Sequence, residues 1–107
     1  MYYPPLSLPA FYIMLALTNA DRHGYEIMKQ IELDSDETIK IGPATLYTTI
    51  KRLLRASFIV EREERPDPQL DDQRRRYYGL TSIGREAVLR EVKRMQSAVH
   101  IFKLKKV

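Results

Sequence analysis

The N-terminal third of the chain contains two stretches whose apolar positions have helical character. In the first, 10–18, nearly every residue is apolar; Ser7 precedes it as an N-terminal cap and Pro9 suits its first turn. The second, 23–33, is apolar on one face only, and an acidic connector without periodicity, 33–41, follows it. The pattern predicts two packed helices, the first of which needs cover from its own domain and from a second subunit.

A third helix is predicted to begin at Pro43, because Leu46, Ile50 and Leu53 recur at the spacing of one helical face. Its other side combines small hydroxyl side chains with Lys and Arg, and it contains no Asp or Glu. Such cations reach phosphates or guanine, and threonines approach base edges closely. A solvated helix face is the simpler alternative. The candidate DNA contacts of this helix are Thr45, Tyr47, Thr48, Thr49, Lys51, Arg52 and Arg55.

Two β-rich stretches, 58–60 and 77–80, predict a hairpin with a long, proline-containing connection. Strand alternation directs Tyr78 toward the core and Tyr77 to the other side of the hairpin. Arginines at the root of the connection suit a minor groove or a phosphate backbone, although the neighbouring acids of 71–72 also suit their neutralisation. The candidate DNA contacts of this wing are Arg74, Arg75 and Arg76.

A last helix is predicted from Ser82, capped by Thr81, to about Phe102. Its apolar positions follow heptad spacing over a length of roughly 30 Å, more than so small a domain covers by itself. We therefore expect this helix and the first one to form a homodimer interface, which would present two recognition helices to DNA. The expected interface residues are Phe11, Tyr12, Leu15, Val88, Val92, Met95, Val99 and Phe102.

The composition is that of an ordinary globular chain, with 44% hydrophobic and 30% charged residues among 107. The absence of Cys excludes thiolate metal sites and disulfides, and the two histidines lie far apart in the sequence. His23 is expected to be a structural residue at a helix start. We found no catalytic or phosphate-binding motif, so we expect neither an enzyme nor a bound metal or cofactor. The longest apolar run, 8–17, is too short to span a membrane, and we expect a cytoplasmic protein without membrane contact.

Charge is distributed unevenly along the chain. Residues 1–41 contain three Lys or Arg and six Asp or Glu and so carry −3, whereas the total of +4 leaves +7 for residues 42–107. A basic C-terminal part indicates a polyanionic partner. Double-stranded DNA is the expected partner, and an acidic protein docking on the same surface is the alternative.

The predicted order is three helices, two strands and a helix, with cations on the third helix. This is the plan of a winged helix-turn-helix, mainly α with a two-stranded β wing, in which the N- and C-terminal helices dimerise. We expect one compact unit with two parts, a DNA-binding domain at 1–81 and a dimerisation helix with a basic tail at 82–107.

Five short motifs carry a resemblance to a known family. They are HGYEI at 23–27, IGPATLY at 41–47, KRL at 51–53, RYYGLT at 76–81 and GR at 84–85. In this order and spacing the sequence resembles the PadR family of bacterial transcriptional regulators over most of its length.

The resemblance implies a dimeric repressor bound to an imperfect inverted repeat and released by a small aromatic or hydrophobic effector near the dimer interface. The short last helix is similar to that of the compact subgroup. The chain departs from the family pattern at Gly42, Ala44 and Thr48, and Ser57 stands where the family has a glycine. An effector cleft is one interpretation of the apolar residues near the two-fold axis; a filled dimer core is the other. The cleft would be lined by Phe11, Tyr12, Leu15, Val92, Met95, Gln96 and Val99.

Overall fold

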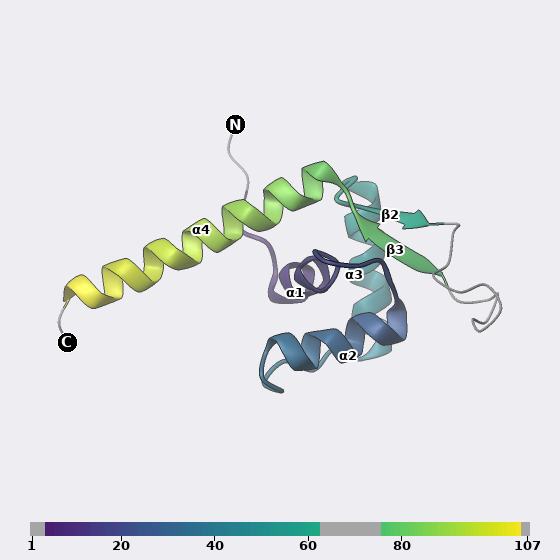
Figure 1. Cartoon of the computed structure of the whole chain (residues 1–107), viewed down its shortest axis with the longest axis horizontal. Helices are drawn as coiled ribbons and strands as arrows, with labels where there is room; N and C mark the ends of the chain where they lie inside the picture. Colours follow the sequence, from purple (N-terminus) through teal and green to yellow (C-terminus); the bar gives the residue numbers. More distant parts are fainter. Residues whose placement is uncertain (1–3, 63–75, 106–107) are drawn as a thin grey trace.

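The structure, a computed structural model, describes residues 4–62 and 76–105, which form four helices and three short strands (Figure 1). In chain order these are α1 (Leu8–Ala16), β1 (Arg22–His23), α2 (Gly24–Asp34), α3 (Pro43–Arg55), β2 (Ile59–Arg62), β3 (Tyr77–Leu80) and α4 (Ser82–Lys105). The mainly helical winged helix-turn-helix expected from the sequence is confirmed.

Polar side chains cap the helices as the sequence predicted. The Ser7 hydroxyl accepts from the amide of Ala10 at 3.2 Å, and the Thr81 hydroxyl accepts from the amide of Gly84 at 2.9 Å. His23 caps α2: its Nδ1 accepts from the amide of Glu26 at 3.3 Å, and the Glu26 carboxylate accepts from the His23 amide at 3.3 Å. His23 therefore has the structural role expected at a helix start.

The strand β1 was not predicted from the sequence. It pairs antiparallel with β3, placing His23 opposite Tyr77, so β3 lies in the middle of a sheet with the order β1-β3-β2. The His23 and Tyr77 rings meet edge to face with their centroids 5.3 Å apart. Tyr77 is buried as well as Tyr78, and the His23 ring of β1 packs against it.

The helix α1 lies at the centre of the molecule, against α2, α3 and α4 (Figure 1). Ile13, Met14 and Ala16 are fully buried there by residues of the same chain. Most of the cover that the apolar sequence of α1 requires thus comes from its own domain. Only part of α1, including Leu8 with 51% of its surface exposed, remains for another contact.

The helix α4 packs on the body of the molecule only along its first half. Its 24 residues extend over about 36 Å at 1.5 Å per residue. Every residue from Met95 to Lys105 is exposed, and this half projects away from the other elements (Figure 1). None of the helices in the described segments is long and apolar enough to span a bilayer.

The end of α3 contains a left-handed residue. The amide of Ser57 donates to the Leu54 carbonyl at 3.1 Å and the amide of Phe58 donates to the Leu53 carbonyl at 3.0 Å, which is the Schellman pattern. Ser57 occupies its left-handed position with φ 63°. Glycine adopts this conformation without the steric cost that a Cβ adds.

We therefore expect Ser57→Gly to raise the free energy of unfolding by about 1 kcal/mol, because it removes the left-handed strain. In a domain of this size that corresponds to roughly 4–8 °C in Tm, measurable by thermal denaturation followed by circular dichroism. Ser57→Ala is the matched control, since it removes the hydroxyl and keeps the Cβ. Equal stabilities of the two variants would refute the assignment of strain to Ser57.

Candidate nucleic-acid interface

The exposed side chains of α3 form one continuous face. Leu46, Ile50 and Leu53 are buried on the opposite face and fix the orientation of the helix against the core. The first half of the exposed face is neutral and, apart from Tyr47, consists of small side chains, and the second half is cationic. Among the residues that the structure describes, its three cations have no ion-pair or hydrogen-bond partner. The exposed residues are Pro43, Ala44, Thr45, Tyr47, Thr48, Lys51, Arg52 and Arg55.

Thr49 does not belong to this face, contrary to the sequence-based expectation. It is 8% exposed, and its hydroxyl donates to the carbonyl of Thr45 at 2.7 Å. Thr49 lies one position before Ile50, on the side of α3 that turns toward α1. Its hydroxyl bonds the preceding turn of its own helix, as buried threonines in helices commonly do.

A shallow hollow adjoins the small, neutral half of the α3 face. Its volume is about 330 Å³, and it lies between the N-terminal end of α1 and the first turns of α3. Thr45, Thr48 and Arg52 bring hydroxyls and a guanidinium to it, beside Ser7 and Pro9. Two helices therefore border the surface that the sequence assigned to α3 alone.

Tyr47 connects α3 to the neighbouring elements. It is 46% exposed, and its ring covers Gly24, where a Cβ would come within 2.3 Å of the Tyr47 hydroxyl. On the sheet, burial raises the pKa of the Tyr78 phenol, and the nearby Glu61 and Tyr47 raise it further. Arg76 acts in the opposite direction. Tyr78 is therefore a neutral phenol in the core.

Two arginine–carboxylate pairs lie at the root of the wing. Arg76 Nη1 is 3.5 Å from Glu61 Oε1, and Arg62 Nε is 3.3 Å from Asp21 Oδ2. Arg76 is a predicted DNA contact, and 71% of its side chain is exposed. The other two wing candidates, Arg74 and Arg75, lie outside the described residues.

The predicted dimer seam is divided between core and surface. Phe11 and Val88 are 5% and 7% exposed within one protomer, so the domain itself already buries them. Met95, Val99 and Phe102 are 41%, 53% and 71% exposed. The remaining expected interface residues are half-buried and are Tyr12, Leu15 and Val92.

Phe11, which was expected to line the effector cleft, lies in the hydrophobic core of the protomer. Gln96 lines a shallow groove of about 500 Å³ on the surface of α4, together with Lys93 and His100 of the same helix. A smaller cavity of about 210 Å³ lies elsewhere, between the segment before α1 and the first half of α4. Within residues 4–62 and 76–105, no three His, Asp or Glu side chains form a group that could hold a metal ion.

Glu91 is a buried polar residue that the sequence reasoning missed. It is 8% exposed; its carboxylate accepts from the amide of Leu6 at 3.1 Å and pairs with Arg94 at 2.9 Å. It therefore ties the segment before α1 to α4. The available signal was its spacing: Glu91 follows Gly84, Ala87 and Val88 on the buried stripe of α4.

Three packed helices, the third of which exposes a cationic face, and an adjoining sheet define this molecule as a winged helix-turn-helix protein. The family described as Transcriptional regulator PadR-like family matches residues 13–90. The chain therefore belongs to the PadR-like family of transcriptional regulators. Its members regulate transcription and are not enzymes, which confirms the expectation against an enzyme.

Several individual proteins are similar to this chain in sequence or in structure. An uncharacterized protein X from Lysinibacillus sphaericus is 30% identical over 92 residues, which cover 86% of this chain and 82% of that protein. The structure of a transcriptional regulator from Clostridium thermocellum is similar with a TM-score of 0.73 and 25% identity, covering 89% of this chain and 86% of that one. A PadR family transcription regulator from Clostridium difficile R20291 has a similar fold, with a TM-score of 0.76, 21% identity and coverage of 94% and 100%.

Proposed function

We propose that this regulator is a homodimeric, sequence-specific DNA-binding repressor that acts in the cytoplasm on an inverted-repeat operator. The observation that carries the proposal is the exposed row of Lys51, Arg52 and Arg55 on α3, for which the described residues supply no counter-charge. The small residues Ala44 and Thr48 precede this row. A helix of this design brings its N-terminal half close to base edges while its cations contact phosphates.

The wing and the hollow beside α1 extend the proposed contact surface. Arg76 lies at the wing root, and Arg74 and Arg75 precede it in the sequence. The proposed DNA-contacting set is therefore Thr45, Tyr47, Thr48, Lys51, Arg52, Arg55, Arg74, Arg75 and Arg76.

The decisive experiment is a titration of the protein against duplex DNA from upstream of its own gene, at salt concentrations from about 50 to 200 mM. Release of phosphate counterions should lower the affinity roughly 1,000-fold over this range, and footprinting should protect an inverted repeat. Absence of duplex binding would refute the proposal. Capture of an acidic protein in its place would support the alternative interaction module.

Dimerisation is proposed through the exposed apolar half of α4. Met95 and Val99 lie in a seam with Val92, and burying them against a second copy would remove apolar surface from water. The two-fold axis would also present two α3 helices to successive major grooves. The expected contacts are Tyr12, Leu15, Val92, Met95, Val99 and Phe102.

We expect Met95→Glu to convert the dimer into a monomer, because a carboxylate would be buried without a partner in the seam. Light scattering coupled to gel filtration should give the protomer mass of 12.6 kDa for this variant and twice that for the wild type. The folded protomer should persist, since Met95 is exposed within it. Ser97→Glu, on another side of α4, is the control. A dimeric Met95→Glu protein would exclude this seam.

Release from DNA is proposed to follow binding of a small hydrophobic or aromatic effector at the two-fold axis. The adaptable side chain of Met95 suits such a ligand. Its neighbours in the proposed site are Tyr12, Leu15, Val92, Gln96 and Val99. This step is tested by adding candidate compounds to the preformed protein–DNA complex and measuring its dissociation.

A further inference from the structure

Glu61 lies on the face of the sheet that turns toward α3. In the β2–β3 register it is opposite Tyr78, and Ile59 is opposite Leu80. Side chains two apart in a strand share a face, so Glu61 lies on the same face as Ile59 and Tyr78. Ile59 and Tyr78 are 1% and 5% exposed in the core, which orients this face toward the helices. Glu61 occupies its outer end, where the wing begins.

This position puts a carboxylate beside the proposed DNA surface. Glu61 Oε1 is 3.5 Å from Nη1 of Arg76, which belongs to the proposed DNA-contacting set at the wing root. A carboxylate at a DNA-binding surface repels the phosphates of the bound duplex. Glu61 therefore opposes the ligand that the α3 cations attract.

The contact of Glu61 with Arg76 contributes little to the stability of the fold. The two charged groups are 3.5 Å apart, and their side chains are 43% and 71% exposed. Exposed pairs of this kind usually contribute less than about 1 kcal/mol. DNA phosphates therefore compete with a weakly held internal partner for the Arg76 guanidinium.

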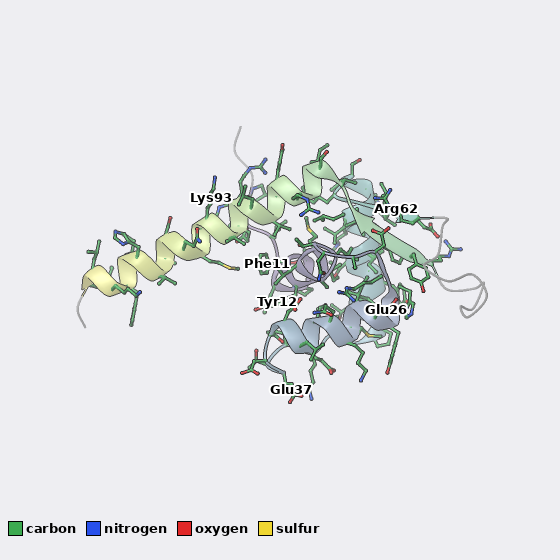
Figure 2. All side chains as sticks on the ribbon, in the orientation of Figure 1. Phe11, Tyr12, Glu26, Glu37, Arg62 and Lys93 are labelled. Carbon is green, nitrogen blue, oxygen red and sulfur yellow. The ribbon has the colours of Figure 1, made fainter. Side chains whose placement is uncertain are left out.

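The second pair at the wing root differs in its location. The Asp21 carboxylate reaches Arg62 across Gly79, where a Cβ would come within 2.5 Å of Asp21 and 2.7 Å of Arg62. Gly79 alternates with Tyr78 along β3, so this pair lies on the opposite face of the sheet. Figure 2 labels Arg62 beside the strands β2 and β3. Asp21 thus provides an internal comparison for Glu61, with the same charge and the same kind of partner.

We propose that Glu61 is an internal competitor of DNA for Arg76 and thereby limits the affinity of the wing for the phosphate backbone. The inference rests on the proposed DNA-binding function and deepens it. Arg76 engages phosphate fully only after the Glu61 carboxylate has been displaced. The wing then contributes less to binding than its arginine content suggests, and Glu61 sets that contribution.

The test is a double-mutant cycle measured by fluorescence anisotropy with the operator duplex. Glu61→Gln should tighten binding about fivefold and steepen the salt dependence by up to about one phosphate contact per protomer. Arg76→Gln alone should change the affinity less than about threefold, since Arg76 is already engaged. In the double variant most of the gain should disappear, because the freed arginine is absent. Asp21→Asn should leave the affinity within about twofold of the wild type.

Each other outcome has a defined meaning. If Glu61→Gln tightens binding equally with and without Arg76, simple repulsion accounts for the effect and the competition is refuted. If Asp21→Asn tightens binding as much as Glu61→Gln does, net charge is the cause and the proposal is again overturned. If the wild type binds the operator and Glu61→Gln binds it with the same affinity, the role of Glu61 is refuted and the proposed DNA-binding function stands. Failure of every variant and the wild type to bind duplex refutes the proposed function itself.

Discussion

Replacing both Lys51 and Arg55 with glutamine is expected to weaken operator binding roughly 1,000-fold. Both cations lie on the exposed face of α3, and a homodimer carries each of them twice. At about 1 kcal/mol for each charged contact, four lost contacts amount to about 4 kcal/mol. The dependence of log affinity on log salt should become shallower by about four phosphate contacts, provided that all four cations contact phosphates. Anisotropy titrations at several salt concentrations measure both effects.

The fold of this double variant should be intact, because neither side chain is buried or paired within the described segments. Thermal denaturation should therefore give a Tm close to that of the wild type. Lys29→Gln combined with Lys105→Gln removes the same charge from α2 and from the end of α4, and this control should bind DNA nearly normally. If the control variant loses as much affinity as the Lys51 and Arg55 variant, net charge explains both losses and α3 is not the recognition helix.

Gly84→Ala is expected to destabilise the protein by about 3 kcal/mol, or roughly 15 °C in Tm. A Cβ at Gly84 would lie 2.0 Å from the carbonyl oxygen of Phe58 and 2.8 Å from Leu80 Cδ1. The Phe58 carbonyl cannot move away freely, because it accepts from the amide of Thr81 at 3.0 Å. The first turn of α4 must therefore separate from the connection between α3 and β2. Urea denaturation measures the loss.

Gly42→Ala provides the matched control for this prediction. The site before α3 is open, with nothing within 4 Å of an added Cβ. Its φ of −79° suits alanine, so the change in stability should remain below about 1 kcal/mol. Similar losses in the two variants would show that Gly84 has no special packing role.

The positions of the helices and of the cationic face were predictable from apolar spacing. Leu46, Ile50 and Leu53 must share one side of α3 if they are to leave water, and this places Lys51 and Arg55 on the other side. Capping by Ser7 and Thr81 was predictable for a similar reason, since a hydroxyl before a helix satisfies a free amide within a few residues. Both the apolar spacing and the capping involve residues that lie within a few positions of one another in the sequence.

The errors occur at positions where distant elements meet. Phe11 and Val88 are as apolar as Met95 and Val99, and spacing along one helix cannot distinguish a core contact from a contact with a second copy. Thr49 borders the exposed face in sequence, yet the approach of α1 buries it. Tyr77 is buried because two residues from far along the chain form β1 beside it.

By itself, the sequence determined the order of the helices and of the two wing strands, the helix caps, the family, and the side of α3 that carries charge, because these depend on interactions within a turn or along one face. Only the tertiary structure decided which apolar residues the protomer itself buries, that Glu91 ties the segment before α1 to α4, and that Glu61 meets Arg76 at the root of the wing. Those features depend on which separate elements become neighbours, and residue spacing along the chain carries no direct record of that.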